Sequence, residues 1–277
     1  MHGWRWVSAT HFRTAAVLGA AAILLAAAGP TMPVERRIPA EDASQGVASD
    51  GRFVYAIDNS RIGKYRIADG QRMAQWVGDP AVVPHLNSCA AVRRELVCAS
   101  SNYPAVPQTS SVEFFDLRTL RHLRSHKFGP TDGSLTAFDR HDGAWWAAFA
   151  QYDGKGGAPG KDHRATRLTR FDDRFRAIGH WTLPPGLLER LAPHSVSGAS
   201  WTPRGLLALT GHDRPEVYLV TVPRGRGVVA LVKIVPITTE GQAIAWDPRR
   251  RTALWSISRR DRALVLTDLS EALSVAR

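Results

Sequence analysis

Residues 241–269, GQAIAWDPRRRTALWSISRRDRALVLTDL, form one complete unit of a pattern that recurs along the chain. An apolar run that opens at Gly241 is followed by a turn at Asp247-Pro248 and by an aromatic segment. The polar tip Ser258 to Asp261 and a β-branched segment complete the unit. Short apolar segments separated by turn residues are typical of antiparallel strands. The stretch therefore predicts strand, turn, strand, polar tip and strand.

Four similar units precede this one, and their third strands are expected to begin at a regular interval of 46 to 54 residues. A period of about 50 residues with four strands per unit is typical of a β-propeller. We therefore predict an all-β fold with five four-stranded blades, and six blades with one degenerate is the alternative. The third strands are expected to begin near Arg61, Ser111, Ala165, Glu216 and Arg262.

The fifth unit contains only three strands before the chain stops. A propeller must cover the edge of its last blade, because an open strand edge invites aggregation. The segment VERRI, residues 34–38, belongs to no unit and is expected to supply the missing strand. The predicted organisation is a signal peptide over 1–28, an N-terminal segment with the ring-closing strand over 29–43, and the propeller over 44–273.

The N-terminus has the order of a secretory signal peptide. Arg5 and Arg13 precede an Ala- and Leu-rich run that ends in three alanines before Gly29. That order of charged, apolar and small residues is recognised for export, and the run is short for a membrane span. We expect a periplasmic or secreted protein, and an uncleaved signal would be its only connection to a membrane.

The chain has a formal net charge of +11, and removal of residues 1–28, which hold two arginines and no acid, leaves +9. The arginines are scattered over turns, as in Arg93-Arg94 and Arg249-Arg250-Arg251. Aromatic and basic residues do not interleave as they do on surfaces that stack nucleic-acid bases. We therefore expect no nucleic-acid partner. A small molecule or a peptide is the expected ligand of a monomer, with a protein partner as the alternative.

The two cysteines, Cys89 and Cys98, flank Arg93-Arg94 symmetrically. If these arginines form a two-residue hairpin turn, the cysteines face one another across two strands. In an exported protein such a pair can oxidise, whereas directly facing strand positions strain a disulfide. Disulfide and unpaired small side chains both remain open, and either role is structural.

In a propeller, the loops that open each blade and the tips between its second and third strands lie on the same face. Neutral hydrogen-bonding groups and rings gather at those positions, whereas the turns of the opposite face, such as Asp50-Gly51 and Asp142-Gly143, are expected to serve backbone shape. We therefore predict a ligand site at one mouth of the channel. Its predicted ligand-binding residues are Gln45, Asn59, Asn87, Asn102, Tyr103, Ser134, Tyr152, Ser197, His212, Gln242 and Arg259.

Catalysis at this mouth would need a carboxylate beside a base. The candidates are His212, Asp213, His85 and Asp58. The same four residues are a possible set of ligands for zinc or another divalent ion, but no HxH or HxxxH spacing supports a metal. We therefore expect no cofactor, and a divalent metal is the alternative.

Residues 46–269 resemble the secreted quinoprotein-like and NHL-like propellers as a broad class. Gln45-Gly46-Val47, followed by a hairpin and a polar tip, is similar to the opening of the five-bladed glutaminyl cyclases of plants and bacteria. That resemblance implies cyclisation of an N-terminal glutamine without a redox cofactor. The Phe-x-Glu-Gly opening of that family has no counterpart, because blade two opens at His85-Leu86-Asn87-Ser88. Only the architecture carries over.

Two functions fit this reading. The first is an exported propeller that binds a small molecule or a peptide at one mouth, as a scaffold or binding protein without catalysis. The alternative is a hydrolase, lactonase or cyclase that uses an Asp/His pair at the same mouth.

Overall fold

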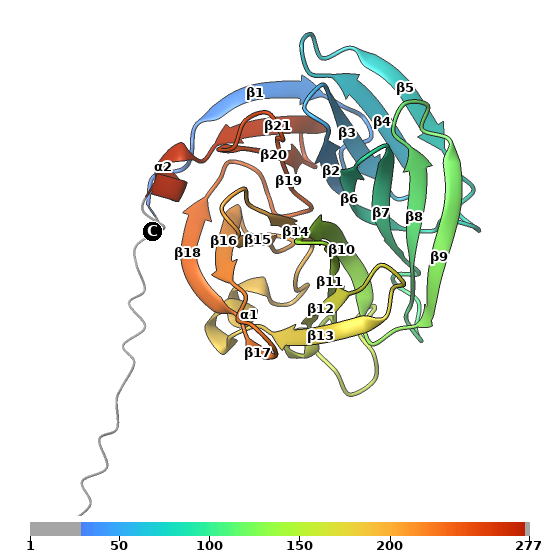
Figure 1. Cartoon of the computed structure of the whole chain (residues 1–277), viewed down its shortest axis with the longest axis vertical. Coiled ribbons are helices and arrows are strands. Elements are labelled where there is room, and N and C mark those ends of the chain that lie inside the picture. Colours follow the sequence, from blue (N-terminus) through green and yellow to red (C-terminus); the bar gives the residue numbers. More distant parts are fainter. Residues whose placement is uncertain (1–28, 275–277) are drawn as a thin grey trace, which may run out of the picture.

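Each repeating unit folds as one antiparallel sheet, and five sheets surround a central axis (Figure 1). The structure is a computed structural model and describes residues 29–274. The prediction of an all-β, five-bladed propeller is confirmed, and the six-bladed alternative is wrong. The third strands begin at or within two residues of the positions expected from the sequence.

The blades follow one another in chain order around the ring. Blade one holds β2 (Gly46–Ser49), β3 (Phe53–Asp58), β4 (Arg61–Arg66) and β5 (Arg72–Val77). Blade two holds β6 (Leu86–Val92), β7 (Glu95–Ser101), β8 (Thr109–Asp116) and β9 (His122–Pro130). Blade three holds β10 (Ser134–His141), β11 (Ala144–Ala150), β12 (Arg167–Phe171) and β13 (Ala177–Thr182). Blade four holds β14 (Gly198–Trp201), β15 (Leu207–Thr210), β16 (Glu216–Thr221) and β18 (Ala230–Pro236). Blade five holds β19 (Ala245–Trp246), β20 (Ala253–Ser258), β21 (Ala263–Asp268) and β1 (Val34–Pro39).

Strand β1 closes the ring, as the segment VERRI was expected to do. It pairs antiparallel with β21 as the outermost strand of blade five, from Val34 opposite Thr267 to Pro39 opposite Ala263. The first strand of the domain thus completes the last blade (Figure 1). The short strand β17 (Gly227–Val228) adds to the edge of blade three by parallel pairing with β13.

The hydrophobic core consists of five clusters among the described residues, one between each pair of neighbouring blades. Strand β3 shows why the sequence folds this way. Val54 and Ala56 pack toward blade five, and Tyr55 and Ile57 pack toward blade two. Because successive side chains of a strand point to opposite faces, a blade between two neighbours needs apolar residues on both. The strands accordingly read as continuous apolar runs.

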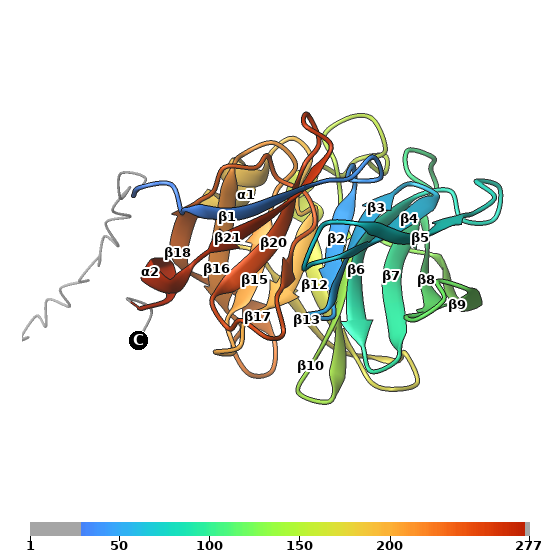
Figure 2. The ribbon, with the colours of Figure 1, turned by 90° about the horizontal axis from the view of Figure 1, so that it is seen from above.

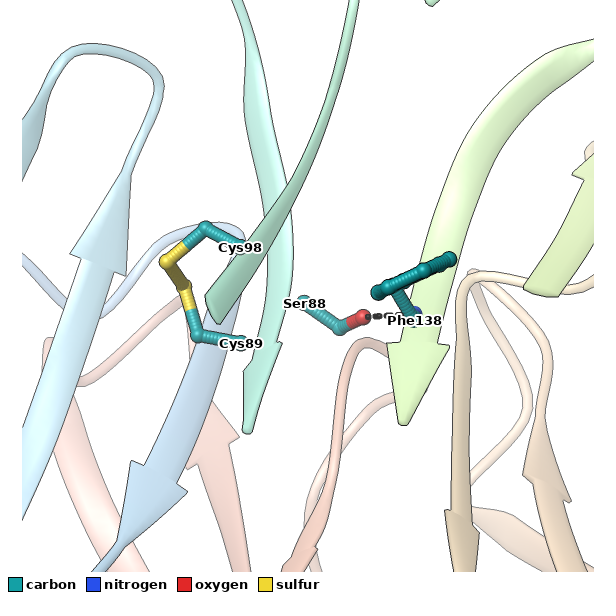
Figure 3. Close-up of a disulfide and its surroundings, with 4 residues drawn as sticks. All are labelled: Ser88, Cys89, Cys98 and Phe138. Carbon is teal, nitrogen blue, oxygen red and sulfur yellow. Dashed lines mark hydrogen bonds between the residues drawn. A yellow bond between two sulfur atoms is a disulfide. The ribbon is translucent and has the colours of Figure 1, made fainter. Parts of the chain in front are cut away.

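Cys89 and Cys98 form a disulfide across β6 and β7 (Figure 3). The two residues are directly opposite in the strand register, as the Arg93-Arg94 turn requires. Both side chains are buried in the cluster between blades one and two. The neighbouring Ser88 accepts a hydrogen bond from the backbone N–H of Phe138, which ties blade two to blade three.

Helical segments are few: η1 (His163–Ala165), α1 (Pro185–Leu191) and α2 (Ser270–Ser274). Helix α1 lies in the segment PPGLLERLAP and buries Leu187, Leu188 and Leu191 between blades three and four. No helix between residues 29 and 274 combines the length and hydrophobicity that a membrane crossing requires. The signal peptide predicted over 1–28 lies outside the described residues.

Candidate functional site

The blade openings and the strand-two to strand-three tips meet at one end of the channel, which we call the polar mouth. The opening of blade two touches the tip of blade one, where Leu86 N–H donates to Asn59 C=O at 2.7 Å. The tips of blades four and five meet through Arg259, whose guanidinium donates to His212. Figure 2 shows the tip between β20 and β21 on the upper side of the ring and the turn after β10 on the lower side. The predicted grouping of these loops is therefore present.

Glycines let the inner segments approach closely at the polar mouth. A Cβ added to Gly46 would lie 2.6 Å from Asn87 O and 2.9 Å from Ala243 Cβ. A Cβ added to Gly198 would lie 2.5 Å from Ala243 Cα. Contacts this short exclude any side chain at either position. The first strands of blades one, four and five therefore converge on Ala243 and narrow the channel at this level.

An aromatic cluster lies at the polar mouth between blades two and three. The rings of His85 and Tyr103 have centroids 5.4 Å apart, and Tyr103 meets Tyr152 edge-on at 5.1 Å. Burial lowers the pKa of His85 to about 4, although Asn87 and Asp58 favour its protonated form. Burial also raises the pKa of Tyr152 to about 12. Near pH 7 His85 is therefore a neutral imidazole and Tyr152 a neutral phenol.

Ser134 lies at the opening of blade three, where its strand pairs with Ala150, two residues before Tyr152. Its hydroxyl is buried beside the Tyr152 phenol, and its hydrogen bond opposes the rise that burial causes in the pKa of that tyrosine. Asn87 is also buried, but its amide is used, because it donates to Leu135 C=O at 2.8 Å and to Ser101 at 3.3 Å. Ser134 and Tyr152 thus place two hydroxyls side by side in this sector.

The Gly-rich segment 154–160 folds against the aromatic cluster. A Cβ on Gly156 would lie 2.4 Å from the Tyr103 ring, so that the backbone itself rests on the tyrosine. Buried Gln108 donates to Gly156 C=O at 2.7 Å, and buried Gln151 accepts from Ala158 N–H at 3.1 Å. These contacts anchor the segment over Tyr103 and Tyr152.

The candidate catalytic residues separate into two groups. His212 Nδ1 lies 2.6 Å from Asp213, and His194 Nδ1 lies 2.9 Å from the other oxygen of the same carboxylate. The Arg259 guanidinium lies 2.9 Å from His212 Nε2. Burial lowers the pKa of His212, with help from the charge of Arg259 and opposition from Asp213.

Asp58 belongs to the other group. It accepts from Ser44 at 2.6 Å and pairs with Arg61. Burial alone would raise the pKa of Asp58, but the hydrogen bonds from Ser44 and Arg61 outweigh it and lower the pKa. Among residues 29–274, no hydrogen bond connects Asp58 or His85 to the His212 group, so the four candidates do not form one catalytic cluster.

The four-residue metal set suggested by the sequence is likewise divided. The possible ligand atoms of His194, His212 and Asp213 lie within 4.8 Å of one another, and His85 and Asp58 are not part of this group. His194 was missed because it follows α1 and precedes the opening of blade four. A second group of the same kind comprises Asp153, Asp162 and His163.

The remaining predicted ligand residues differ in accessibility. Asn59 is exposed, and Ser197 is partly buried. Asn102 is used locally, because it donates to Pro107 C=O at 3.0 Å and accepts from Thr109 N–H. With its amide oriented to satisfy both neighbours, Gln242 donates to Gln45 C=O at 3.3 Å and accepts from Arg259 at 3.2 Å. Gln242 and Arg259 therefore hold blades five, one and four together.

The turns at the opposite end of the channel were expected to serve backbone shape. The ends of the first strands and the turns that follow line a cavity of about 650 Å³. The sequence analysis missed Asp139, Trp201 and Trp246, which lie on its wall. The Trp-Asp and Trp-Thr pairs that end the first strands of blades five and four were the available signal.

No family model matches this chain, and no curated protein matches it. Among solved structures, the luciferin-regenerating enzyme aligns with a TM-score of 0.50 at 10% identity, over 85% of this chain and 96% of that chain. A chain of a mitotic checkpoint complex aligns with a TM-score of 0.49 at 11% identity, over 90% and 99%. A chain of hydrazine synthase from Kuenenia stuttgartiensis aligns with a TM-score of 0.47 at 12% identity, over 81% and 83%. At these identities the likeness to the luciferin-regenerating enzyme shows the fold alone.

Proposed function

We propose that this chain is an exported β-propeller that binds a small molecule or a peptide end at the polar mouth, between blades two and three, without catalysis. One observation carries the proposal. The buried hydroxyls of Ser134 and Tyr152 lie beside the rings of His85 and Tyr103. Few polar groups set among rings are the usual composition of a small-ligand site.

The chemistry of the cluster favours an uncharged polar ligand. His85 is neutral at pH 7, and a neutral imidazole can both donate and accept. The hydroxyls of Tyr103 and Ser134 have the same dual capacity. Aromatic faces bind flat or sugar-like surfaces through their apolar bodies. A sugar, a lactone or the uncharged part of a peptide end has this combination of features.

Export is part of the proposal. Its support is the Cys89–Cys98 disulfide, because such bonds persist in oxidising compartments, together with the signal-like composition of residues 1–28. The periplasm or the extracellular medium is the proposed location. Signal removal is testable by N-terminal sequencing of the protein recovered after export, which should begin close to Gly29.

The test is a thermal-shift screen of the purified protein against sugars, lactones and short peptides. A ligand at a hundred times its Kd stabilises the folded state by roughly 2.7 kcal/mol, which shifts the melting temperature measurably. The Tyr103→Ala variant should lose the shift, and Ser134→Ala should reduce it. Arg93→Asn, at the opposite end of the channel, is the matched control and should keep it. Absence of any hit, or a hit that survives Tyr103→Ala, would refute binding at the aromatic cluster.

A second function, hydrolysis, is favoured by one observation. Asp213 orients His212 as a carboxylate orients a catalytic base, and burial keeps His212 in its neutral form. A base at this position requires that Arg259 release His212 Nε2. Turnover of an ester or lactone that disappears in His212→Gln and persists in Tyr103→Ala would support this function over simple binding.

A further inference from the structure

The cavity of about 650 Å³ opens at the end of the channel opposite the polar mouth. We name it the aromatic cavity, and the residues that matter to the argument are His141, Trp201, Trp246, Asp139, Arg93 and Arg251. Its volume lies in the range of 300 to 1,000 Å³ that is typical of small-ligand sites. We propose that the aromatic cavity is a second binding site, specific for a small ring-bearing carboxylate.

The walls of the cavity supply flat apolar surface from three blades. His141 of blade three stacks on Trp201 of blade four, with centroids 4.1 Å apart and planes 8° from parallel. Trp246 of blade five lines the same space and is 8% exposed. Indole and imidazole faces favour a flat ring, which can stack or pack edge-on. These three rings therefore select the shape of the ligand.

The carboxylates in the wall are already satisfied by the protein. Asp139 is completely buried and accepts from the backbone N–H groups of Trp201 at 3.0 Å and Arg140 at 2.7 Å. Burial raises the pKa of Asp139. Asp247 accepts from the Trp255 indole at 3.0 Å and from Arg249 N–H at 2.9 Å.

Asp50, the third acid of the wall, is occupied in the same way. It accepts from the backbone N–H groups of Arg52 and Phe53 and from the Tyr55 hydroxyl. Protein donors therefore occupy three of the roughly four acceptor sites of Asp50 and Asp139 and two of those of Asp247, so the protein itself holds all three carboxylates.

Several hydrogen-bond donors in the wall of the aromatic cavity, in contrast, have capacity that the protein does not use. Within the described residues, the indole N–H groups of Trp201 and Trp246 are buried without a partner. Arg93 lines the cavity and makes no hydrogen bond or ion pair in the same part of the chain. Arg251 donates to Pro203 C=O at 3.0 Å, which leaves most of its N–H groups available. A surplus of donors, two of them guanidinium groups, matches a carboxylate, which accepts only.

The experiment measures binding of benzoate, nicotinate and indole-3-acetate to the purified protein by calorimetry and ligand-observed NMR. The uncharged amides of the same three acids are measured in parallel. At least one acid should bind saturably, and its amide should bind at least about tenfold more weakly, because a charge-assisted hydrogen bond is lost.

Variants locate the site. Arg93 adopts a φ of +58° in its turn, a conformation that asparagine tolerates, so Arg93→Asn removes the charge without backbone strain. It should raise the Kd of the acid about tenfold. Trp246→Phe, which keeps a ring and removes the N–H, should raise the Kd ~3-fold or more. Arg224→Ala, an exposed arginine outside the cavity, is the control and should leave the Kd unchanged.

Several results would overturn the proposal. Failure of all three acids to bind saturably excludes it, and so does an amide that binds as tightly as its acid. An acid whose Kd is unchanged in both Arg93→Asn and Trp246→Phe binds elsewhere. Loss of acid binding in Tyr103→Ala would place the ligand at the polar mouth, and would support the proposed function while it removes this one.

Discussion

Burial lowers the pKa of His85 to about 4 from its ordinary value of 6.5. The unfolded chain therefore binds a proton at this histidine between pH 6.5 and pH 4 that the folded protein does not bind. The free energy of unfolding should therefore fall as the pH falls from 6.5 to 4. Below pH 4, His85 should cause no further loss. The difference between the two pKa values corresponds to on the order of 3 kcal/mol of unfolding free energy.

Urea denaturation at pH 7 and at pH 4.5, in the wild type and in His85→Gln, measures this effect. Burial lowers the pKa of His126, His180 and His212 as well, so the wild type carries other losses of the same sign. The difference between the two proteins isolates His85. The variant should lose less stability than the wild type on acidification, and an identical loss would show that His85 is accessible to protons in the folded protein.

The Arg259 guanidinium contacts Nε2 of His212, one of three residues that could hold a metal ion together with His194 and Asp213. Its positive charge would oppose the binding of a cation nearby. The wild type, purified without chelator, should therefore carry substoichiometric zinc by elemental analysis. Arg259→Ala frees the nitrogen and should bind zinc at least about tenfold more tightly, since removal of one like charge at close range is worth more than 1.4 kcal/mol.

The matched control is Arg260→Ala, because Arg260 is exposed and contacts Asp261 instead of a histidine. Its zinc affinity should equal that of the wild type. Stoichiometric zinc in the wild type, or equal affinities of wild type and Arg259→Ala, would contradict the role given to Arg259.

Two features hold the hairpin of β6 and β7 together: its turn and its disulfide. The bond joins residues nine apart, and a loop of this length restricts the unfolded chain by an amount worth about 2–3 kcal/mol. Cys89→Ala/Cys98→Ala should lower the free energy of unfolding by that amount while it keeps the blade register set by Arg93-Arg94. Denaturation of the wild type with and without reductant gives an independent value.

The double variant should show no response to reductant, which is the control for effects elsewhere in the protein. A double variant as stable as the wild type would mean that strain in the folded hairpin offsets the gain from restricting the unfolded chain.

Local chemistry explains why the elements were predictable and part of the site was not. The Arg93-Arg94 and Asp142-Gly143 turns fix their hairpins within a few residues, and the paired strands follow. Asp139, in contrast, acquires its role by accepting from the N–H of Trp201, 62 residues away. That contact depends on how blades three and four are tilted against one another, which no local pattern encodes. Local patterns therefore could not assemble the aromatic cavity, although the Trp-Asp and Trp-Thr pairs mark two of its blades, whereas the polar mouth followed from the repeat.

Local sequence patterns also do not show which partner each polar side chain at the polar mouth will bind. Asn87, Gln242 and Arg259 were expected to face a ligand, and their side chains also connect neighbouring blades. Composition placed these residues at the correct end of the channel. Whether an amide meets a ligand or a neighbouring backbone depends on packing between blades, which a single blade's sequence does not contain.

For the whole molecule, stability depends on a closed ring, because each hydrophobic cluster is shared by two blades. Strand β1 covers the backbone edge of β21 and contributes Ile38, 2% exposed, to the cluster between blades five and one. Met32, just before it, is 6% exposed and joins the cluster between blades four and five. Glu35 pairs with Arg250 across the closure.

A chain that begins at Glu41 should therefore lose roughly 3–6 kcal/mol from the exposure of Ile38 and Met32 contacts alone, and should expose an open strand edge that promotes association. Circular dichroism should show a lower melting temperature, and size-exclusion chromatography should show oligomers. A chain that begins at Gly29 retains β1 and is the matched control, with monomeric behaviour and an unchanged melting temperature. Addition of a peptide of residues 29–40 should restore the melting temperature of the shorter chain, because the peptide can pair with β21 in the same register. Equal melting temperatures for the two chains would show that the ring does not need its N-terminal strand.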